Sequence, residues 1–234
     1  MGGGGLPAGP GKSLIRRQIE ECLRHTAASA PRSLRHTAGV PQLCIAHDAA
    51  ADELLSRDPL ALLLGMLFDQ QFPMERAFAG PRLLADRLGV DGLDAASLAA
   101  EDPEQLAKVF QGPPAVHRYP GSMAARTQEV CRLLVERYGG HAEALWDGVP
   151  DGATLVTRVG ELPGFGAQKS KIFVALLGKQ YGVTPPGWRE AAGAYGEEGS
   201  RRSVADITGP ESLAEVRRFK QEQKQAAKTA RTGA

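Results

Sequence analysis

Apolar residues recur at helical spacing along most of the chain between Ala49 and Tyr181. The clearest case follows Asp58-Pro59, which predicts a helix start because proline is favoured at the first helical position. One face of this helix is apolar and consists of Leu60, Leu63, Leu64, Leu67 and Phe68. Pro73 ends or restarts the helix. Since little of the chain alternates with a period of two, the sequence predicts an all-α fold of helices joined by short turns.

Other helices are expected at similar spacing along the chain. They cover residues 74–88, 94–100, 103–110, 122–138, 142–146 and 152–159, and a last one runs to about Tyr181. Ser122 is expected to cap the longest of them, which Gly139-Gly140 closes. Its inward positions are Val130, Leu133, Leu134 and Tyr138. Residues 42–46 are short and apolar, which fits either a brief strand or an extended entry segment.

The two ends of the chain differ in composition from the middle. Residues 1–40 begin with a Gly/Pro-rich run and are expected to be a poorly ordered extension, although residues 13–25 have helical apolar spacing. Gly9–Ser13 is not a phosphate-binding P-loop, because Leu6 stands where that motif requires glycine. Residues 41–200 form the expected main domain. Residues 201–234 form a basic tail, either a solvated helix that frays or a segment that contacts DNA.

Composition narrows the class of protein. The chain has 234 residues and a net charge of +1, so any nucleic-acid binding must come from a local patch. Its three cysteines are far apart and form no Cys-x-x-Cys pair, which argues against disulfides and against zinc or iron–sulfur sites. They are Cys22, Cys44 and Cys131. No apolar run reaches the roughly 18–20 residues of a membrane span, and no secretory signal is present, so we expect a cytoplasmic protein without membrane contact.

The segment Leu162–Lys171 carries the main chemical signal. Its sequence, Leu-Pro-Gly-Phe-Gly followed by Ala-Gln-Lys-Ser-Lys, leads directly into an apolar helical run. Two glycines around one apolar residue suit a tight turn that needs positive φ or a close backbone approach. The helix start that follows leaves backbone N–H groups that can bind an anion such as a DNA phosphate. The segment 162–171 therefore predicts the second half of a helix-hairpin-helix, which binds the DNA backbone without reading sequence.

Three features in this order resemble a known family. They are Gln70-Gln71 at a helix end, Gly139-Gly140 after a long helix, and Leu162–Gly166 at a helix start. The chain is similar in these features to the helix-hairpin-helix (HhH-GPD) superfamily of base-excision DNA glycosylases. That superfamily includes endonuclease III, the bacterial alkyladenine glycosylases and the 8-oxoguanine glycosylases. The resemblance covers roughly residues 58–181. It implies a two-lobed helical fold with a cleft between the lobes and double-stranded DNA as partner, and we expect a monomer without a cofactor.

The resemblance also implies roles for individual residues. In the family, the Gln-Gln helix end lies at the minor groove, and one glutamine fills or probes the gap left by a flipped base. Amides suit this role because they both donate and accept hydrogen bonds. The alternative is that Gln70 and Gln71 are exposed amides at a helix end. The expected phosphate-binding residues are Gly164, Gly166 and the following Gln168, Lys169, Ser170 and Lys171, with Phe165 anchoring the turn in the core.

Two departures from the family pattern limit the expected chemistry. Bifunctional members carry a Schiff-base lysine two residues after the second glycine, where this chain has Gln168, and an amide is no nucleophile. Lys169 lies one residue later, about 100° around the helix. In addition, the window Thr184–Glu190, where the family has its catalytic aspartate, holds no aspartate. The cysteine cluster of the iron–sulfur members is also absent.

Two other carboxylates could replace the missing aspartate, which stabilises positive charge on the sugar and orients a water. They are Glu190 and Asp69, each of which could instead be a helix-terminal carboxylate in water. Trp188 offers either an aromatic face for the flipped base or a core side chain. His117 and Tyr119 either line a pocket or lie on the surface.

Three functions remain open at this point. The first is a monofunctional DNA glycosylase that hydrolyses the N-glycosidic bond of a flipped damaged or mispaired base. The second is a non-catalytic protein that binds lesions or bent duplex on the same scaffold. The third, from another class, is a helical protein-interaction module whose Gly-Phe-Gly segment is only a tight turn.

Overall fold

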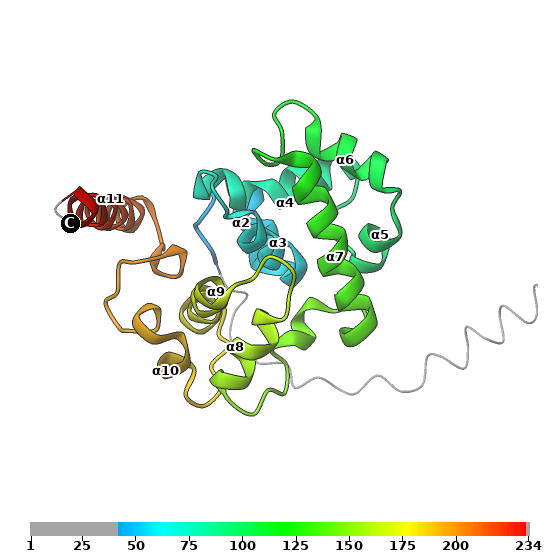
Figure 1. Cartoon of the computed structure of the whole chain (residues 1–234). Coiled ribbons are helices and arrows are strands. Elements are labelled where there is room, and N and C mark those ends of the chain that lie inside the picture. Colours follow the sequence, from blue (N-terminus) through cyan, green and yellow to red (C-terminus); the bar gives the residue numbers. More distant parts are fainter. Residues whose placement is uncertain (1–41, 233–234) are drawn as a thin grey trace, which may run out of the picture. The chain divides into compact units, whose positions relative to one another are not determined.

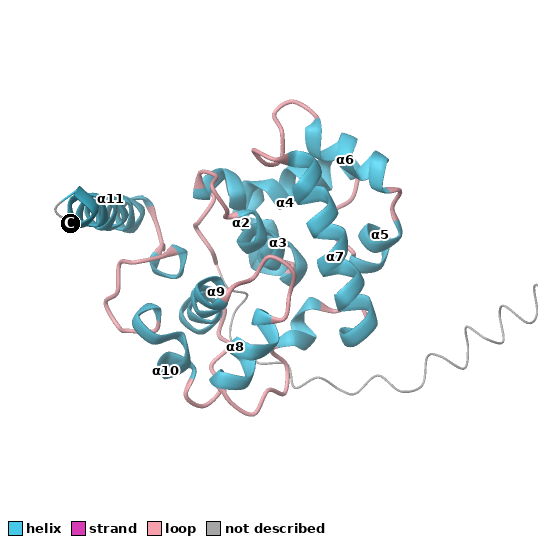
Figure 2. Cartoon of the chain, in the orientation of Figure 1, coloured by secondary structure: helices cyan, strands magenta, loops and turns pink. Residues whose placement is uncertain are grey.

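In a computed structural model, which describes residues 42–232, the chain is built from α-helices and short 3-10 helices (Figure 1). Figure 2 shows no strand in this part of the chain, and the all-α prediction is confirmed for it. All described residues belong to one unit, Ala38–Ala234. The predictions for residues 1–40, including the helix at 13–25, lie outside the described residues, whereas residues 201–232 fall in the same unit as those before them.

The helices follow one another closely along the chain. The α-helices are α2 (Ala49–Arg57), α3 (Pro59–Phe68), α4 (Met74–Leu88), α5 (Ala95–Ala100), α6 (Pro103–Gln111), α7 (Pro120–Tyr138), α8 (Gly152–Gly160), α9 (Ala167–Gln180), α10 (Trp188–Ala192) and α11 (Pro210–Thr232). The 3-10 helices are η1 (Ala142–Leu145), η2 (Gly193–Tyr195) and η3 (Val204–Asp206). The expected helices at 74–88, 94–100, 103–110 and 152–159 agree with α4, α5, α6 and α8 to within one residue at each end.

Helix α3 is the most buried element among the described residues. All of its residues from Leu60 to Phe68 are buried, as expected for a helix that is apolar on every side. Its start is fixed by Asp58, whose Oδ1 accepts from Leu60 N at 2.9 Å and whose Oδ2 accepts from Leu93 N at 2.8 Å. Helix α4 lies close against it, because a Cβ added at Gly65 would lie 2.8 Å from Phe78 Cδ1. This packing holds the C-terminal end of α3, and with it Asp69 and Gln70, in a defined position.

The longest predicted helix begins earlier than expected. Helix α7 starts at Pro120 with Tyr119 as N-cap, so Ser122 lies in the first turn and the prediction that it caps the helix is wrong. The reason is Pro120, because proline at the first helical position sets the start by itself. The closure is confirmed, since Gly139 takes the left-handed conformation with φ 61°.

The segment before α2 is irregular, with bends at residues 45–47, and no strand is found in residues 42–232. Side chains of α2 hold it instead, as Ile45 N and Ala46 N both donate to Asp52 Oδ1 at 2.8 Å, and Leu43 N donates to Ser56 Oγ at 3.0 Å. Of the two alternatives for residues 42–46, the brief strand is not observed, and the segment is an irregular entry to α2 with bends from Ile45 onward.

Helices α8, α9 and α10 pack against one another (Figure 1). The short helix η3 also packs against α9. An ion pair joins these two elements, with Lys179 Nζ 2.6 Å from Asp206 Oδ1 and both side chains largely buried. The other carboxylate oxygen of Asp206 accepts from the backbone N–H groups of Arg202 and Ser203 at 2.8 and 3.1 Å. This network keeps the chain beyond α10 against α9.

Helix α11 is anchored through its first turns. Leu213 and Val216 are buried, Arg217 forms an ion pair with Glu75 of α4, and Arg201 pairs with Glu215. Residues 220–226 are exposed. The helix expected for the tail is observed up to Thr232, and its contact with DNA stays a prediction. A search of residues 42–232 for a helix long and apolar enough to cross a bilayer finds none.

Candidate nucleic-acid interface

The turn between α8 and α9 has the geometry that its glycines predict. Gly164 has φ 85°, and Phe165 N donates to Leu162 O at 3.0 Å, which closes the turn. Phe165 is buried, with its ring 6.0 Å from that of Phe173. The positive-φ glycine and the buried anchor are thus both confirmed.

The start of α9 is open to a ligand. Gly166 is its N-cap, with φ −94° and ψ 175°, and no side chain caps the helix. A Cβ added at Gly166 would have no neighbour within 4 Å. The first-turn N–H groups of α9 therefore point to a place that an anion can occupy. Unlike Gly164, Gly166 does not have positive φ, so its backbone conformation does not require glycine.

The turn packs against the C-terminal end of α3. Gln70 Nε2 donates to Gly164 O at 3.4 Å across 94 residues of sequence, and to Leu67 O at 2.9 Å. A Cβ at Gly164 would lie 2.6 Å from Arg126 Cδ and 2.8 Å from Leu67 Cδ1. The two motifs that the sequence analysis singled out, Gln70-Gln71 and Gly-Phe-Gly, thus lie side by side.

We expect Gly164→Ala to lower the free energy of unfolding by about 2–4 kcal/mol. A left-handed non-glycine residue costs roughly 1–2 kcal/mol, and the overlap with Leu67 and Arg126 adds about as much. The matched control is Gly166→Ala, which should cost at most about 1 kcal/mol because its backbone is extended and its surroundings are empty. Denaturant unfolding measures both, and equal midpoints for the two variants would contradict the geometry.

The two glutamines have different environments. Besides its two donated bonds, Gln70 accepts from Arg126 Nη1 at 3.2 Å through Oε1, so its amide is fully engaged within the protein. Gln71 is exposed and takes φ 52°, a left-handed conformation that costs a non-glycine residue about 1 kcal/mol or more. Of the pair, only Gln71 presents its amide outward.

His117 and Tyr119 lie beside Gln71, and the surface alternative is wrong for His117. Its side chain is buried, with Nε2 at 3.1 Å from Gln70 O and Nδ1 accepting from Tyr119 N at 3.1 Å. Burial lowers the pKa of His117 despite these backbone partners, which favours the neutral ring. Tyr119 is 48% exposed, with the Arg118 guanidinium over its ring. With Gln71 and Ser122, these rings line a pocket of about 180 Å³.

The side chains of Lys169 and Ser170 make hydrogen bonds within the protein. Lys169 Nζ donates to Leu67 O at 3.0 Å, at the C-terminal end of α3. Burial, opposed by the charge of Asp69, lowers the pKa of Lys169 to about 8. Ser170 is buried, with Oγ donating to Gly166 O at 3.0 Å. The side chains of Lys169 and Ser170 thus make contacts within the protein, whereas Lys171 is exposed, and phosphate binding by this segment stays a prediction. The physical reason is the orientation of α9 about its own axis, which directs Lys169 to the end of α3 and Ser170 to the turn and leaves Lys171 in solvent.

Asp69 differs sharply from Glu190 in its surroundings. Asp69 follows α3 directly and is half-buried. Burial raises its pKa above the ordinary value, and the positive charges of Lys220 and Lys169 oppose the shift. Glu190 is exposed in the first turn of α10. Of the two expected carboxylates, only Asp69 lies at the meeting point of α3, α9 and α11.

Trp188 is a core side chain, so its proposed stacking face is unavailable to a base. The side chain is 8% exposed, and a Cβ added at Gly178 would lie 2.4 Å from its ring atoms. Its backbone also packs closely on Gly152, where a Cβ would lie 2.4 Å from Trp188 Cα. Two glycines on α8 and α9 thus make the space that the tryptophan fills.

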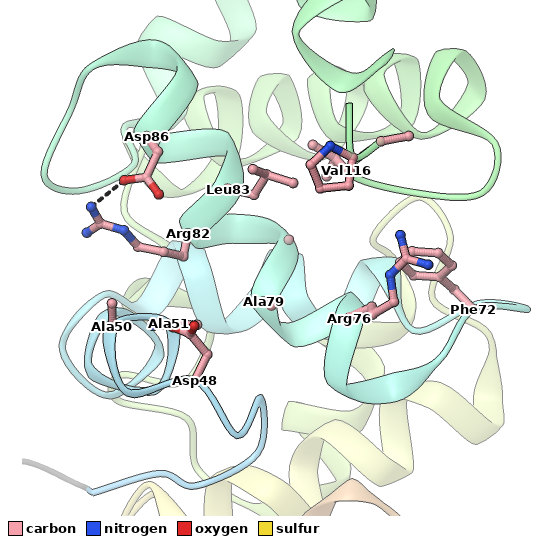
Figure 3. Close-up of a pocket in the computed structure, with 13 residues that line it drawn as sticks. Asp48, Ala50, Ala51, Phe72, Arg76, Ala79, Arg82, Leu83, Asp86 and Val116 are labelled. Atoms are coloured by element: carbon pink, nitrogen blue, oxygen red, sulfur yellow. Dashed lines mark hydrogen bonds and ion pairs between the residues drawn. The ribbon is translucent and has the colours of Figure 1, made fainter. Parts of the chain in front are cut away.

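A separate hollow lies between α2 and α4, away from the turn (Figure 3). It measures about 460 Å³, and Phe72, Arg76 and Leu83 line it together with Ala50 and Ala51. Arg76 lies over the Phe72 ring, 4.9 Å from its centroid, and Arg82 pairs with Asp86 at the rim. None of the site residues expected from the sequence lines it.

No protein-family model matches the chain, and no curated protein matches it significantly.

Proposed function

We propose that the chain is a DNA-binding base-excision repair protein, a monofunctional glycosylase with the two-lobed HhH-GPD fold. The observation that carries this proposal is the contact between Gln70 and Gly164. Through this contact, the exposed Gln71, which follows Gln70, lies on the same surface as the uncapped N-terminus of α9. An anion site beside a probing amide suits a duplex from which one base has been extruded.

In this proposal the backbone of α9 binds one phosphate and Lys171 adds charge beside it, without sequence information. Gln71 enters the gap in the duplex, while Gln70 braces the turn through Gly164 and Arg126. The exposed ring of Tyr119 borders the same pocket as Gln71.

Asp69 is the carboxylate that we assign to the excision step. The C1′–N bond breaks, its electron pair leaves with the base, and positive charge develops on the sugar. A water then bonds to C1′ through oxygen, and its proton goes to the departing base. A nearby carboxylate stabilises the developing charge, which is typically worth several kcal/mol in a site shielded from water. The half-buried position of Asp69 provides such shielding.

A single-turnover assay tests the proposal. Duplexes that carry uracil, alkylated purines or 8-oxoguanine are incubated with excess protein, and abasic product is measured after alkaline cleavage. We expect product from at least one of these duplexes. Tight binding to an abasic-site duplex with no product from any base would favour the non-catalytic alternative instead, which the absence of aspartate from residues 184–190 motivates.

We expect no Schiff base between the protein and an abasic site. Gln168 cannot act as the amine nucleophile, and Lys169 is held on Leu67 O. Incubation with an abasic duplex and sodium borohydride should therefore leave no covalent complex, whereas a trapped complex that disappears in Lys169→Met would show lyase chemistry. The matched control is Lys171→Met, the exposed lysine of the same helix.

A further inference from the structure

A further pocket, distinct from the two described above, lies between the first turn of α9 and α11. It measures about 420 Å³, within the range of small-ligand sites. Its lining includes Gln168, Tyr195, Arg202, Phe219, Lys220 and Gln223. Gln168 belongs to the same helical turn as the uncapped N-terminus of α9, so the pocket begins within one turn of the expected phosphate site.

The polar groups of this pocket are mainly hydrogen-bond donors. Gln168 Nε2 donates to Tyr195 Oη at 2.8 Å, so the Tyr195 hydroxyl hydrogen is available to an acceptor. Arg202 and Lys220 add two cations, and none of the lining residues is a carboxylate. The nearest carboxylates face these cations from outside the lining: Glu197 Oε2 lies 3.8 Å from Arg202 Nη2, and Asp69 interacts with Lys220.

The pocket also holds a flat apolar surface. The Phe219 ring lines it and carries the Arg202 guanidinium 5.4 Å from its centroid. An aromatic ring stacks on any nucleobase, because every base has a π-face, with a contribution of about 1–3 kcal/mol per base. Lys220 connects this pocket to the α3 end, since it lines the pocket and interacts with Asp69.

We propose that this pocket receives the extruded base and selects uncharged, carbonyl-rich bases over cationic alkylated purines. The inference rests on the proposed function and specifies its substrate class. Carbonyl oxygens accept from the Tyr195 hydroxyl, the amides and the two cations. A base with a formal positive charge, such as 7-methylguanine, meets Arg202 and Lys220 with no carboxylate in the lining to balance it.

The test uses binding rather than turnover, so that it does not depend on catalysis. Duplexes with 2′-fluoro sugars, which resist excision, carry uracil, 8-oxoguanine or 7-methylguanine at one position, and the full chain is titrated with each. We expect uracil or 8-oxoguanine to be bound at least tenfold more tightly than 7-methylguanine. Arg202→Gln should reduce this preference to about twofold. The matched control, Arg218→Gln, removes the same charge from an exposed position that does not line the pocket, and it should preserve the preference.

The outcomes separate the two proposals. Suppose that the chain binds duplex and that Gly166→Asp weakens this binding, but that the chain does not prefer one base over another. This result, or a base preference that Arg202→Gln does not change, overturns the base pocket and leaves the proposed function standing. If no duplex binds, the proposed function is overturned. The pocket is then tested alone, by titrating free uracil and 7-methylguanine and following the side-chain amide signals of Gln168 and Gln223. Signals that do not move with uracil, or that move equally with both bases, overturn the pocket as well.

Discussion

Gly166→Asp should weaken binding to duplex DNA by about 10–100-fold and at the same time stabilise the protein. The aspartate side chain would occupy the open space at the N-terminus of α9, where we expect the phosphate. It would also accept hydrogen bonds from the first-turn N–H groups, which no side chain caps at present. The extended backbone of Gly166 fits an aspartate N-cap, which adds about 0.5–1 kcal/mol to the free energy of unfolding. Loss of one charge-assisted contact and repulsion of the phosphate, about 1.4–2.8 kcal/mol together, give the expected drop in affinity.

The matched control for this variant is Gly209→Asp. Gly209 precedes α11 directly, and a Cβ there would also have no neighbour within 4 Å. The control thus makes the same change of charge beside another helix start, outside the proposed interface. Fluorescence anisotropy with a labelled duplex and denaturant unfolding measure the two effects. If both variants lose the same affinity, the added negative charge alone explains the loss, and the phosphate site at Gly166 is contradicted.

Asp69→Asn should lower the single-turnover excision rate by about 10²–10³-fold and raise the stability of the protein at pH 7. Burial raises the pKa of Asp69, so folding favours its neutral form even in the presence of Lys169 and Lys220. Stability from this group is fully present below the ordinary carboxyl pKa of about 3.9 and is lost as pH rises through the folded-state value. Ionisation of the half-buried Asp69 therefore costs the wild type stability, and the asparagine variant is free of that cost. DNA affinity should not fall, because the substitution removes a negative charge near the phosphates.

Glu190→Gln is the control for the carboxylate assignment. Its side chain is exposed on α10, so we expect an excision rate within about twofold of the wild type and an unchanged unfolding midpoint. A large loss of excision in Glu190→Gln, with little loss in Asp69→Asn, would transfer the catalytic role to Glu190. The gain in stability in Asp69→Asn is best measured by unfolding at pH 7 and again near pH 3.5, where it should be much smaller.

Local sequence chemistry predicted the turn well. Gly164 needs its positive φ and Phe165 needs burial for reasons contained within a few residues, and both expectations are confirmed. The end of α3 was also predictable, since Pro73 and the apolar run before it bound that helix. These features depend on backbone conformation and on local hydrophobic spacing, which a sequence carries directly.

The orientation of side chains against distant elements was harder to predict. Lys169 and Ser170 face inward because α9 is rotated to place them against Leu67 and Gly166, a result of tertiary packing. Trp188 is buried because Gly178 of α9 leaves room for its ring and Gly152 of α8 leaves room for its backbone. The difference between Gln70 and Gln71 depends on Arg126, 56 residues from Gln70, and no local pattern signals it.

In the two proposals, one surface binds three parts of the DNA. The phosphate binds at the α9 N-terminus, the gap in the duplex lies at Gln71, and the extruded base lies near Gln168 and Phe219. Stability and function oppose one another at two of its residues, because Gly166 leaves a helix uncapped and Asp69 keeps a carboxylate half-buried. Such costs are typical of functional sites, where stabilising substitutions commonly reduce activity.

Hydrogen exchange with and without duplex DNA tests directly whether the α9 N-terminus and Gln70-Gln71 bind the duplex. The full chain is exchanged alone and with a duplex that carries an abasic-site analogue, and the protection of each peptide is compared. If these residues form the interface, exchange slows in peptides that span residues 164–171 and 70–72 and does not change in α5 or α6. Unchanged exchange at 164–171 under saturating duplex, or protection confined to the hollow between α2 and α4, would contradict it.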